Sequence, residues 1–253
     1  MKRYGPWAVI AGASEGIGAA FAEALAAKGI NVVLAARRPE PLDQLAAALP
    51  VQSRVVSADL STRDGLRAVF EATEGLEVGL VVANAALSPI GPFAEADPAE
   101  LERALDLNCR APMLLARHYL PAMLARGRGG LVIMSSLAGQ QGSPGLSLYA
   151  GTKAFGMILA EGLWAEARER GVDVVACVAG AVSTPGLVGR EQSRAPGTLP
   201  PQVVAAQALA ALGRKPRMVP GGLMRFSSQL MTRLMPRKSA ITMMGRASKK
   251  TLG

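Results

Sequence analysis

Tyr149 and Lys153 are the residues whose types and spacing most directly suggest chemistry in this chain of 253 residues. They lie four positions apart in the segment LYAGTK, a spacing that puts both side chains on one face of a helix. An isolated tyrosine titrates near about 10, and a neighbouring cation favours its phenolate. The pair therefore predicts a tyrosine of lowered pKa that protonates a carbonyl oxygen while the carbonyl carbon receives a hydride. A surface pair with the same spacing is the alternative.

An apolar run followed by a glycine-rich turn lies near the N-terminus, in WAVIAGASEGIGAAFAEALAAKG at residues 7–29. Residues 7–11 are typical of a buried strand, and an alanine-rich helix begins near Ile17. Gly12, Gly16 and Gly18 have no side chains, so backbone N–H groups and the positive helix end can approach a pyrophosphate. The spacing G-x-x-x-G-x-G differs from the general fingerprint G-x-G-x-x-G. We therefore expect a dinucleotide site, with a plain strand–helix turn as the alternative.

Several segments, in order along the chain, resemble the short-chain dehydrogenase/reductase family over residues 5–190. The loop at 12–18 matches the family's glycine loop, and Asp59 matches its adenine-contacting aspartate. ANAA at 83–86 is similar to the family's Asn-Asn-Ala-Gly, and AGAVST at 179–184 to its Pro-Gly-x-Val-x-Thr. Because none of the replaced residues is a catalytic group, we expect activity to survive these departures.

The resemblance implies a catalytic tetrad of Asn108, Ser136, Tyr149 and Lys153. Ser136 precedes Tyr149 by thirteen residues, the family's usual interval, which favours it over Ser135. By resemblance, Ser136 would hydrogen-bond the substrate oxygen, and Lys153 would bind the nicotinamide ribose as well as lower the tyrosine pKa. Asn108 would hold a water that links Lys153 to solvent, and a kink in its helix is the alternative role for this residue.

The implied cofactor is a nicotinamide dinucleotide, and the charge beside the second strand indicates which one. An NAD site usually offers an acid about 20 residues beyond the glycine loop, but here Ala36 ends the strand and Arg37 and Arg38 follow. Two guanidinium groups suit a 2′-phosphate, so we predict NADP(H) in preference to NAD(H). Arg37 is the first choice for the residue that contacts this phosphate. Glu15 argues the other way, because some NADP-dependent relatives carry a basic residue there. The expected cofactor contacts are Gly12, Ser14, Glu15, Gly16, Ile17, Gly18, Arg37, Arg38, Asp59, Leu60, Asn84, Ala85, Tyr149, Lys153, Gly180, Val182 and Thr184.

Apolar runs that suit strands alternate with helical patterns along most of the chain. The expected strands are 7–11, 31–36, 54–58, 78–83, 130–135 and 172–178, and the expected helices are 17–28, 40–48, 62–74, 97–125, 149–170 and 201–213. This alternation predicts an α/β chain with a doubly wound Rossmann fold, a parallel sheet covered by helices on both faces. One edge of the sheet, where ligands bind in such folds, would then collect the strand ends at Gly12, Ala36, Asp59, Asn84, Ser136 and Gly180.

The last part of the chain differs from the rest in charge. Residues 1–191 hold 17 Lys/Arg and 19 Asp/Glu, whereas residues 192–253 hold 11 Lys/Arg and no acid. We therefore expect a Rossmann catalytic domain at 1–215, with a substrate loop at 183–200, and a basic, Met-rich extension at 216–253. A helical stripe that ends before Pro236 could contact an anionic membrane, roof the substrate pocket or pack on another subunit; its members are Leu223, Phe226, Leu230, Met231 and Leu234.

Composition excludes several classes of protein. A hydrophobic content of 50% excludes disorder over most of the chain. The sequence has no Cys/His cluster with metal-ligand spacing, so no metal site is expected, and its one histidine, His118, is expected to be packed or at the surface. Cys109 and Cys177 suit the reduced thiols of a cytoplasmic protein. Neither a membrane span nor a nucleic-acid reader motif is indicated.

The combined prediction is an enzyme that reduces a ketone or aldehyde with NADPH, reversibly, with a hydrophobic substrate favoured. A non-catalytic dinucleotide-binding regulator and a membrane-docked scaffold are the alternatives. Family resemblance implies a homodimer or homotetramer, paired through the helices near 97–125 and 149–170.

Overall fold

A parallel sheet of seven strands, in the order β3-β2-β1-β4-β5-β6-β7, runs through the computed structural model of this chain, which describes residues 2–184 and 197–252. The α/β doubly wound fold is therefore confirmed. The strands are β1 (Trp7–Ala11), β2 (Asn31–Ala36), β3 (Ser53–Ser57), β4 (Val78–Ala83), β5 (Gly129–Ser136), β6 (Val172–Ala179) and β7 (Arg217–Met218). The first six match the predicted strands closely. The two-residue β7 was not predicted, because so short an edge strand leaves no apolar run to find.

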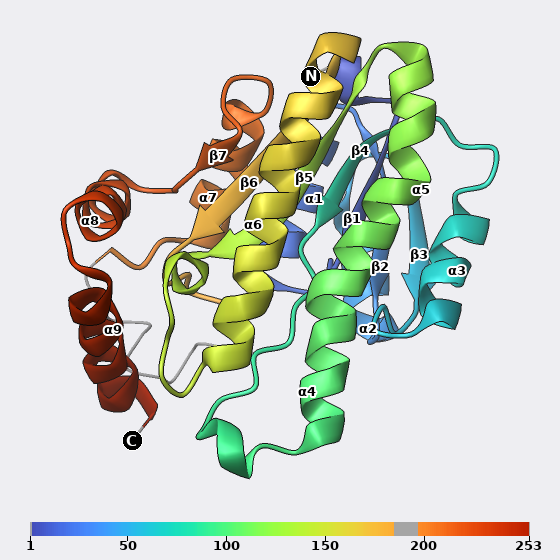
Figure 1. Cartoon of the computed structure of the whole chain (residues 1–253). Helices are drawn as coiled ribbons and strands as arrows, with labels where there is room; N and C mark the ends of the chain where they lie inside the picture. Colours follow the sequence, from blue (N-terminus) through green and yellow to red (C-terminus); the bar gives the residue numbers. More distant parts are fainter. Residues whose placement is uncertain (1, 185–196, 253) are drawn as a thin grey trace.

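Helices cover both faces of the sheet (Figure 1). One face is covered by α1 (Gly16–Ala26), α2 (Pro39–Ala48) and α7 (Pro201–Ala211), and the other by α3 (Arg63–Ala72), α5 (Ala111–Arg126) and α6 (Ser147–Ala167). Successive strand residues point to opposite faces, so in β1 Ile10 joins the first core and Val9 the second. Two buried faces explain why the strands other than the edge strands β3 and β7 read as near-continuous apolar runs.

The helix expected at 97–125 is interrupted in the structure. The cap residue Asp97 accepts a hydrogen bond from the Ala99 N–H, and α4 (Pro98–Leu105) begins after it. A π-helical turn at Asp106–Arg110 then joins α4 to α5. Such turns insert one extra residue per turn and are frequent at functional sites. The interruption falls on Asn108, which the sequence singled out.

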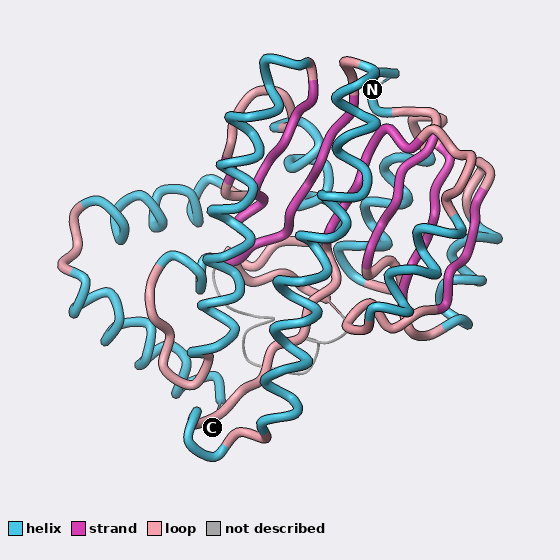
Figure 2. The backbone as a smooth tube through the Cα atoms, turned by 45° about the vertical axis from the view of Figure 1, so that its right-hand side comes forward, coloured by secondary structure: helices cyan, strands magenta, loops and turns pink. Residues whose placement is uncertain are grey.

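The C-terminal helices α8 (Gly222–Arg233) and α9 (Arg237–Leu252) lie beyond β7, outside the layers that cover the sheet (Figures 1 and 2). Pro236 separates them, as predicted. The division into 1–215 and 216–253 stays a prediction, and β7 lies just past that boundary. Of the predicted substrate loop at 183–200, residues 185–196 lie outside the described chain. Among the described residues, no helix is long and apolar enough to cross a membrane.

Candidate active site

The carboxyl ends of the strands meet at one edge of the sheet and leave a hollow of about 600 Å³. Its lining joins the glycine loop to the ends of β2 and β4 and to the segment after β3, and comprises Gly12, Ser14, Glu15, Gly16, Ile17, Ala36, Arg37, Arg38, Ala58, Asp59, Leu60, Asn84, Ala85, Ala86, Leu107 and Thr184. Most of the predicted cofactor contacts are therefore brought together. The predicted contacts that do not line this hollow are Gly18, Tyr149, Lys153, Gly180 and Val182.

The glycine loop has a shape that other residues would not allow. Gly12 has a φ of +81°, and a Cβ atom at Gly18 would lie 1.9 Å from the Gly12 carbonyl oxygen. The Asn84 side chain donates to that same oxygen at 2.9 Å and so ties the loop to the end of β4. The first turn of α1 opens on the hollow at Gly16 and Ile17. Backbone N–H groups at a helix N-terminus bind anions, so this loop fits the pyrophosphate of a dinucleotide.

The two arginines after β2 differ in their surroundings. Arg38 forms an ion pair with Glu15, with 2.6 Å between Nη2 and Oε2. Arg37 is exposed at the hollow, and its guanidinium has no ion-pair partner in the described chain. The negative charge of Glu15, which argued against a 2′-phosphate, is therefore balanced by its neighbour, and Arg37 remains the cation available to a ligand.

Asp59 is held in place at the end of the hollow that follows β3. One carboxylate oxygen accepts hydrogen bonds from the Ser61 N–H at 3.0 Å and from the Ser61 hydroxyl at 2.7 Å. The other oxygen lies 2.7 Å from the Arg103 guanidinium. Partial burial acts to raise the pKa of Asp59, but these hydrogen bonds and the Arg103 charge outweigh it and leave the pKa below its usual value. Asp59 is therefore a fixed anion and hydrogen-bond acceptor.

Tyr149 and Lys153 lie on the same side of α6, as their spacing predicted. The Lys153 ammonium is 5.6 Å from the centre of the Tyr149 ring and donates to the Met134 carbonyl oxygen of β5 at 3.1 Å. Burial lowers the pKa of Lys153 to about 8, although interaction with Cys109 acts in the opposite direction. An ammonium is thus held beside the phenol, and it releases its proton more readily than a lysine in water.

The sequence predicted a lowered pKa for Tyr149, and that direction is wrong for the chain by itself. Removal of the phenol from water raises the pKa of Tyr149 above its usual value, and a hydrogen bond with Ser136 offsets only part of that effect. The sequence showed the cation nearby but not how far the ring would be withdrawn from solvent. Tyr149 is therefore a protonated phenol at neutral pH.

The two adjacent serines at the end of β5 have different roles. The Ser135 hydroxyl is buried and donates to the Lys153 carbonyl oxygen at 2.7 Å, which holds α6 against the sheet. Ser136 is half-buried, accepts a hydrogen bond from the Ala138 N–H at 3.2 Å, and is the serine that interacts with Tyr149. This geometry agrees with the choice of Ser136 from the thirteen-residue interval.

Asn108 connects three segments around the site. Its amide donates to the Leu87 carbonyl oxygen at 2.7 Å and to the Thr152 hydroxyl at 3.0 Å, and its oxygen accepts from the Leu87 N–H at 2.8 Å. The side chain thereby joins the π-helical turn to the loop after β4 and to α6. Asn108 therefore both lies in the helix interruption and bonds to two other segments of the site. The water expected between Asn108 and Lys153 stays a prediction.

The C-terminal helices contact the loops around Ser136. Gln140, in the 3₁₀ turn Leu137–Gln140, is paired with Ser228 of α8 through hydrogen bonds of 2.8 and 3.0 Å. Arg237 of α9 donates to the Gln140 carbonyl oxygen at 2.8 Å. A Cβ atom at Gly180 would lie 3.1 Å from the Met224 sulfur of α8. Sequence reasoning missed the Gln140–Ser228 contact, because polar residues 88 positions apart carry no signal of pairing.

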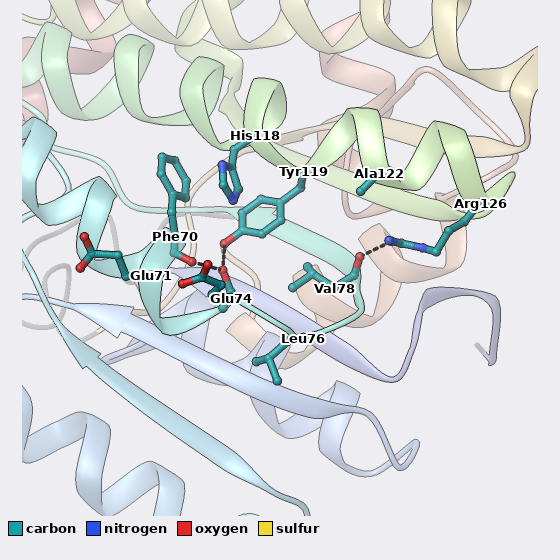
Figure 3. Close-up of a pocket in the computed structure, with 10 residues that line it drawn as sticks. Phe70, Glu71, Glu74, Leu76, Val78, His118, Tyr119, Ala122 and Arg126 are labelled. Carbon is teal, nitrogen blue, oxygen red and sulfur yellow. Dashed lines mark hydrogen bonds between the residues drawn. The ribbon is translucent and has the colours of Figure 1, made fainter.

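A second hollow, of about 370 Å³, lies beside the amino end of β4, at the opposite edge of the sheet (Figure 3). His118 stacks there on Phe70, with 3.9 Å between ring centres, and meets Tyr119 edge to face. Burial lowers the pKa of His118. The histidine is therefore an exposed residue that packs against two aromatic rings, in keeping with the prediction of a packed or surface residue, and Tyr149 does not line this hollow.

The chain is similar to known proteins over most of its length. Residues 6–195 match the family model described as short chain dehydrogenase. A 7beta-hydroxysteroid dehydrogenase of Clostridium sardiniense is 33% identical over 231 residues, which cover 88% of each chain. A very-long-chain 3-oxoacyl-CoA reductase of Anas platyrhynchos is 36% identical over 179 residues, 67% of this chain and 57% of that protein.

Solved structures agree with these sequence matches. A 7beta-hydroxysteroid dehydrogenase structure superposes with a TM-score of 0.90 at 30% identity, over 96% of this chain and 98% of the other. A short-chain dehydrogenase of Sphingobium yanoikuyae, solved with NADPH, gives a TM-score of 0.78 at 30% identity, over 88% and 91% of the two chains. The chain belongs to the short-chain dehydrogenase/reductase family and is an NAD(P)-dependent oxidoreductase that acts on CH–OH groups.

Proposed function

We propose that this enzyme reduces bulky, hydrophobic ketones or aldehydes with NADPH, reversibly, and that Tyr149 is its general acid and base. The observation that carries the proposal is the grouping of Tyr149 with Ser136 and Lys153 at the ligand-binding edge of the sheet. A regulator that only bound a dinucleotide would have no need of a proton donor at this point.

The bound cofactor supplies the hydride, and the protein supplies the proton. In reduction, Tyr149 donates its phenolic proton to the carbonyl oxygen, and in oxidation it takes that proton back. Its raised pKa keeps the phenol protonated and ready to act as an acid. Ser136 donates to the same oxygen and stabilises the charge that develops there. The Lys153 ammonium stabilises the tyrosinate left after proton transfer.

Two observations support NADPH as the cofactor, and two more support a hydrophobic substrate. Arg37 is free for a 2′-phosphate while Arg38 balances Glu15, and a relative of 30% identity was solved with NADPH. Beside the site, Met224 and Leu137 both come close to Gly180 and provide apolar surface. The names of the relatives, hydroxysteroid dehydrogenase and very-long-chain 3-oxoacyl-CoA reductase, also refer to molecules that contain a large apolar group, a steroid or a long acyl chain.

We further propose that the enzyme works in the cytoplasm as a homodimer or homotetramer. Its cysteines, Cys109 and Cys177, are both free, which suits a reducing compartment. Large apolar side chains are exposed on the helices expected to pair, namely Leu105 on α4, Met113 on α5, and Phe155 and Ile158 on α6. A subunit interface would remove them from water.

NADPH oxidation tests the proposal directly. The purified chain would be given a series of ketones that increases from short linear compounds to fused-ring ones, with NADPH and then with NADH. We expect kcat/KM to increase with apolar size and to be higher with NADPH. Tight NADPH binding without turnover of any carbonyl compound would instead support the regulator.

A further inference from the structure

Helix α8 and Leu234, the residue that follows it, carry a row of large apolar side chains that are exposed to water. Leu223, Phe226, Leu230 and Leu234 are exposed to 56%, 66%, 43% and 76% respectively. Their spacing of three or four residues places them on one side of the helix. Here they are called the outer stripe. Met231, which the sequence grouped with them, is half-buried and lies to one side.

The neighbouring side of α8 holds the helix to the body of the protein. Ser228 is buried and bonded to Gln140, and Met224 is half-buried and lies against Gly180. The helix is therefore anchored through one side, while no part of the described chain covers the other. In Figures 1 and 2, α8 and α9 form a projection from the body. The outer stripe is thus an exposed apolar surface of the kind that binds a partner outside this chain.

The charge around the outer stripe indicates the chemistry of that partner. Residues 192–253 hold 11 Lys/Arg and no Asp/Glu. Of these cations, Arg225 on α8 and Arg237 and Lys238 on α9 are exposed. An apolar stripe in a segment whose charged residues are all cations is the pattern of a helix that lies in the interface of an anionic bilayer. A second copy of this chain would fit less well, because a two-fold axis through the stripe would place like cations against one another.

We propose that α8 docks this enzyme on the surface of an anionic lipid membrane, with the outer stripe in the boundary between headgroups and acyl chains. The rest of the inference depends on the proposed function. Since α8 also contacts Gln140 and Gly180 beside the site, docking places the site close to the bilayer. A hydrophobic ketone dissolved in the membrane then reaches Tyr149 with a short path through water.

Vesicle sedimentation of the full chain tests the docking. The probes are vesicles of phosphatidylcholine alone and of phosphatidylcholine with phosphatidylglycerol, each at low and high salt. The test variant is Phe226→Ser with Leu230→Ser. Its matched control is Ile90→Ser with Phe93→Ser, which removes two exposed apolar side chains beside the acids Glu95 and Asp97.

We expect the wild type and the control to bind the anionic vesicles, with binding weakened by salt because the cations are exposed. The test variant should lose about tenfold or more in affinity, because two large apolar side chains no longer leave water. Its NADPH-dependent activity on a small water-soluble ketone should not change. If the wild type itself shows no NADPH-dependent activity on this ketone, that result counts against the proposed function and not against docking.

Two results would overturn the docking proposal. One is equal binding of the test variant and the wild type to anionic vesicles. The other is no binding of the wild type to either kind of vesicle. In that case, a smaller particle for the test variant than for the wild type in light scattering would identify the outer stripe as a subunit interface.

Discussion

Burial at the site pushes both members of the Tyr149–Lys153 pair toward their uncharged forms. The pKa of Tyr149 is raised and that of Lys153 is lowered to about 8. The phenol therefore keeps its proton around neutral pH, whereas Lys153 is the group of the pair whose charge changes near neutrality. Neither direction could be predicted from the sequence, because the loss of hydration depends on how β5 and α6 pack.

The pH dependence of reduction should follow Lys153. The ammonium is present below its pKa of about 8 and is lost as pH rises through that value, so kcat/KM for reduction should fall on the alkaline side. The expected profile is level at lower pH and decreases from about pH 8 upward. In Lys153→Arg the cation persists, so any remaining activity should lose this decline. A wild-type profile that stays level well above pH 8 would mean that Lys153 is not the titrating group.

Cofactor choice should depend on Arg37. In Arg37→Asp, the carboxylate would repel a 2′-phosphate and accept a hydrogen bond from a free 2′-hydroxyl. We expect the ratio of kcat/KM for NADPH to that for NADH to fall by about tenfold or more, the effect of losing one charge-assisted hydrogen bond. Arg67→Asp makes the same charge change on the exposed side of α3 and is the control. An equal ratio in the two variants would assign the phosphate contact to another residue.

At the scale of elements, the six long strands, and the edge at which they end, could be predicted from the sequence. Five of them are buried on both faces and so read as nearly continuous apolar runs. The sixth, the edge strand β3, has Arg54 and Ser57 exposed and was found from its two central valines. Other features depend on contacts between distant segments and could not. The ion pair of Glu15 with Arg38 balances the acid in the glycine loop, which the sequence had counted against a 2′-phosphate. The π-helical turn at Asn108 interrupts a helix whose sequence pattern continues through it.

The Gln140–Ser228 contact should affect how the enzyme holds large substrates. Ser228→Ala removes the hydroxyl that joins α8 to the turn after Ser136, and a hydrogen bond of this kind contributes about 0.5–1.5 kcal/mol. We expect KM for a bulky ketone to rise about two- to tenfold, with a smaller effect on a short ketone. Ser227→Ala is the control, since within the described residues the Ser227 hydroxyl bonds to the Leu223 carbonyl oxygen of its own helix and to no other segment. Equal effects of the two variants would show that α8 does not shape the site.

At the scale of the whole molecule, charge and exposed apolar surface are placed on different parts of the chain. The cationic excess belongs to residues 192–253, and the apolar side chains of α5 and α6 lie outside that segment. Like cations repel across a symmetry axis, so assembly through α5 and α6 is favoured over assembly through the C-terminal helices. The sequence predicted this charge division and left contact with the substrate pocket as one of three roles for the segment. It did not indicate that Ser228 and Arg237 would bond to Gln140.

Assembly should therefore be sensitive to α6 and insensitive to α9. Ile158→Arg places a charge in the proposed interface and should give a smaller particle in light scattering, while removal of residues 237–253 should leave the oligomer intact. Ile158 is exposed in the single chain, so its replacement should not affect folding. A monomer after the truncation, with Ile158→Arg unchanged in size, would assign the interface to the C-terminal helix.

The central claim is that Tyr149 donates the proton during carbonyl reduction, and single-turnover NADPH oxidation by Tyr149→Phe tests it most directly. The control is Tyr119→Phe, which also loses one phenolic hydroxyl, here bonded to Thr73 beside the second hollow. We expect Tyr149→Phe to bind NADPH normally and to slow hydride transfer by about 10²–10⁴-fold, with Tyr119→Phe close to the wild type. A rate for Tyr149→Phe within a few-fold of the wild type would contradict the account.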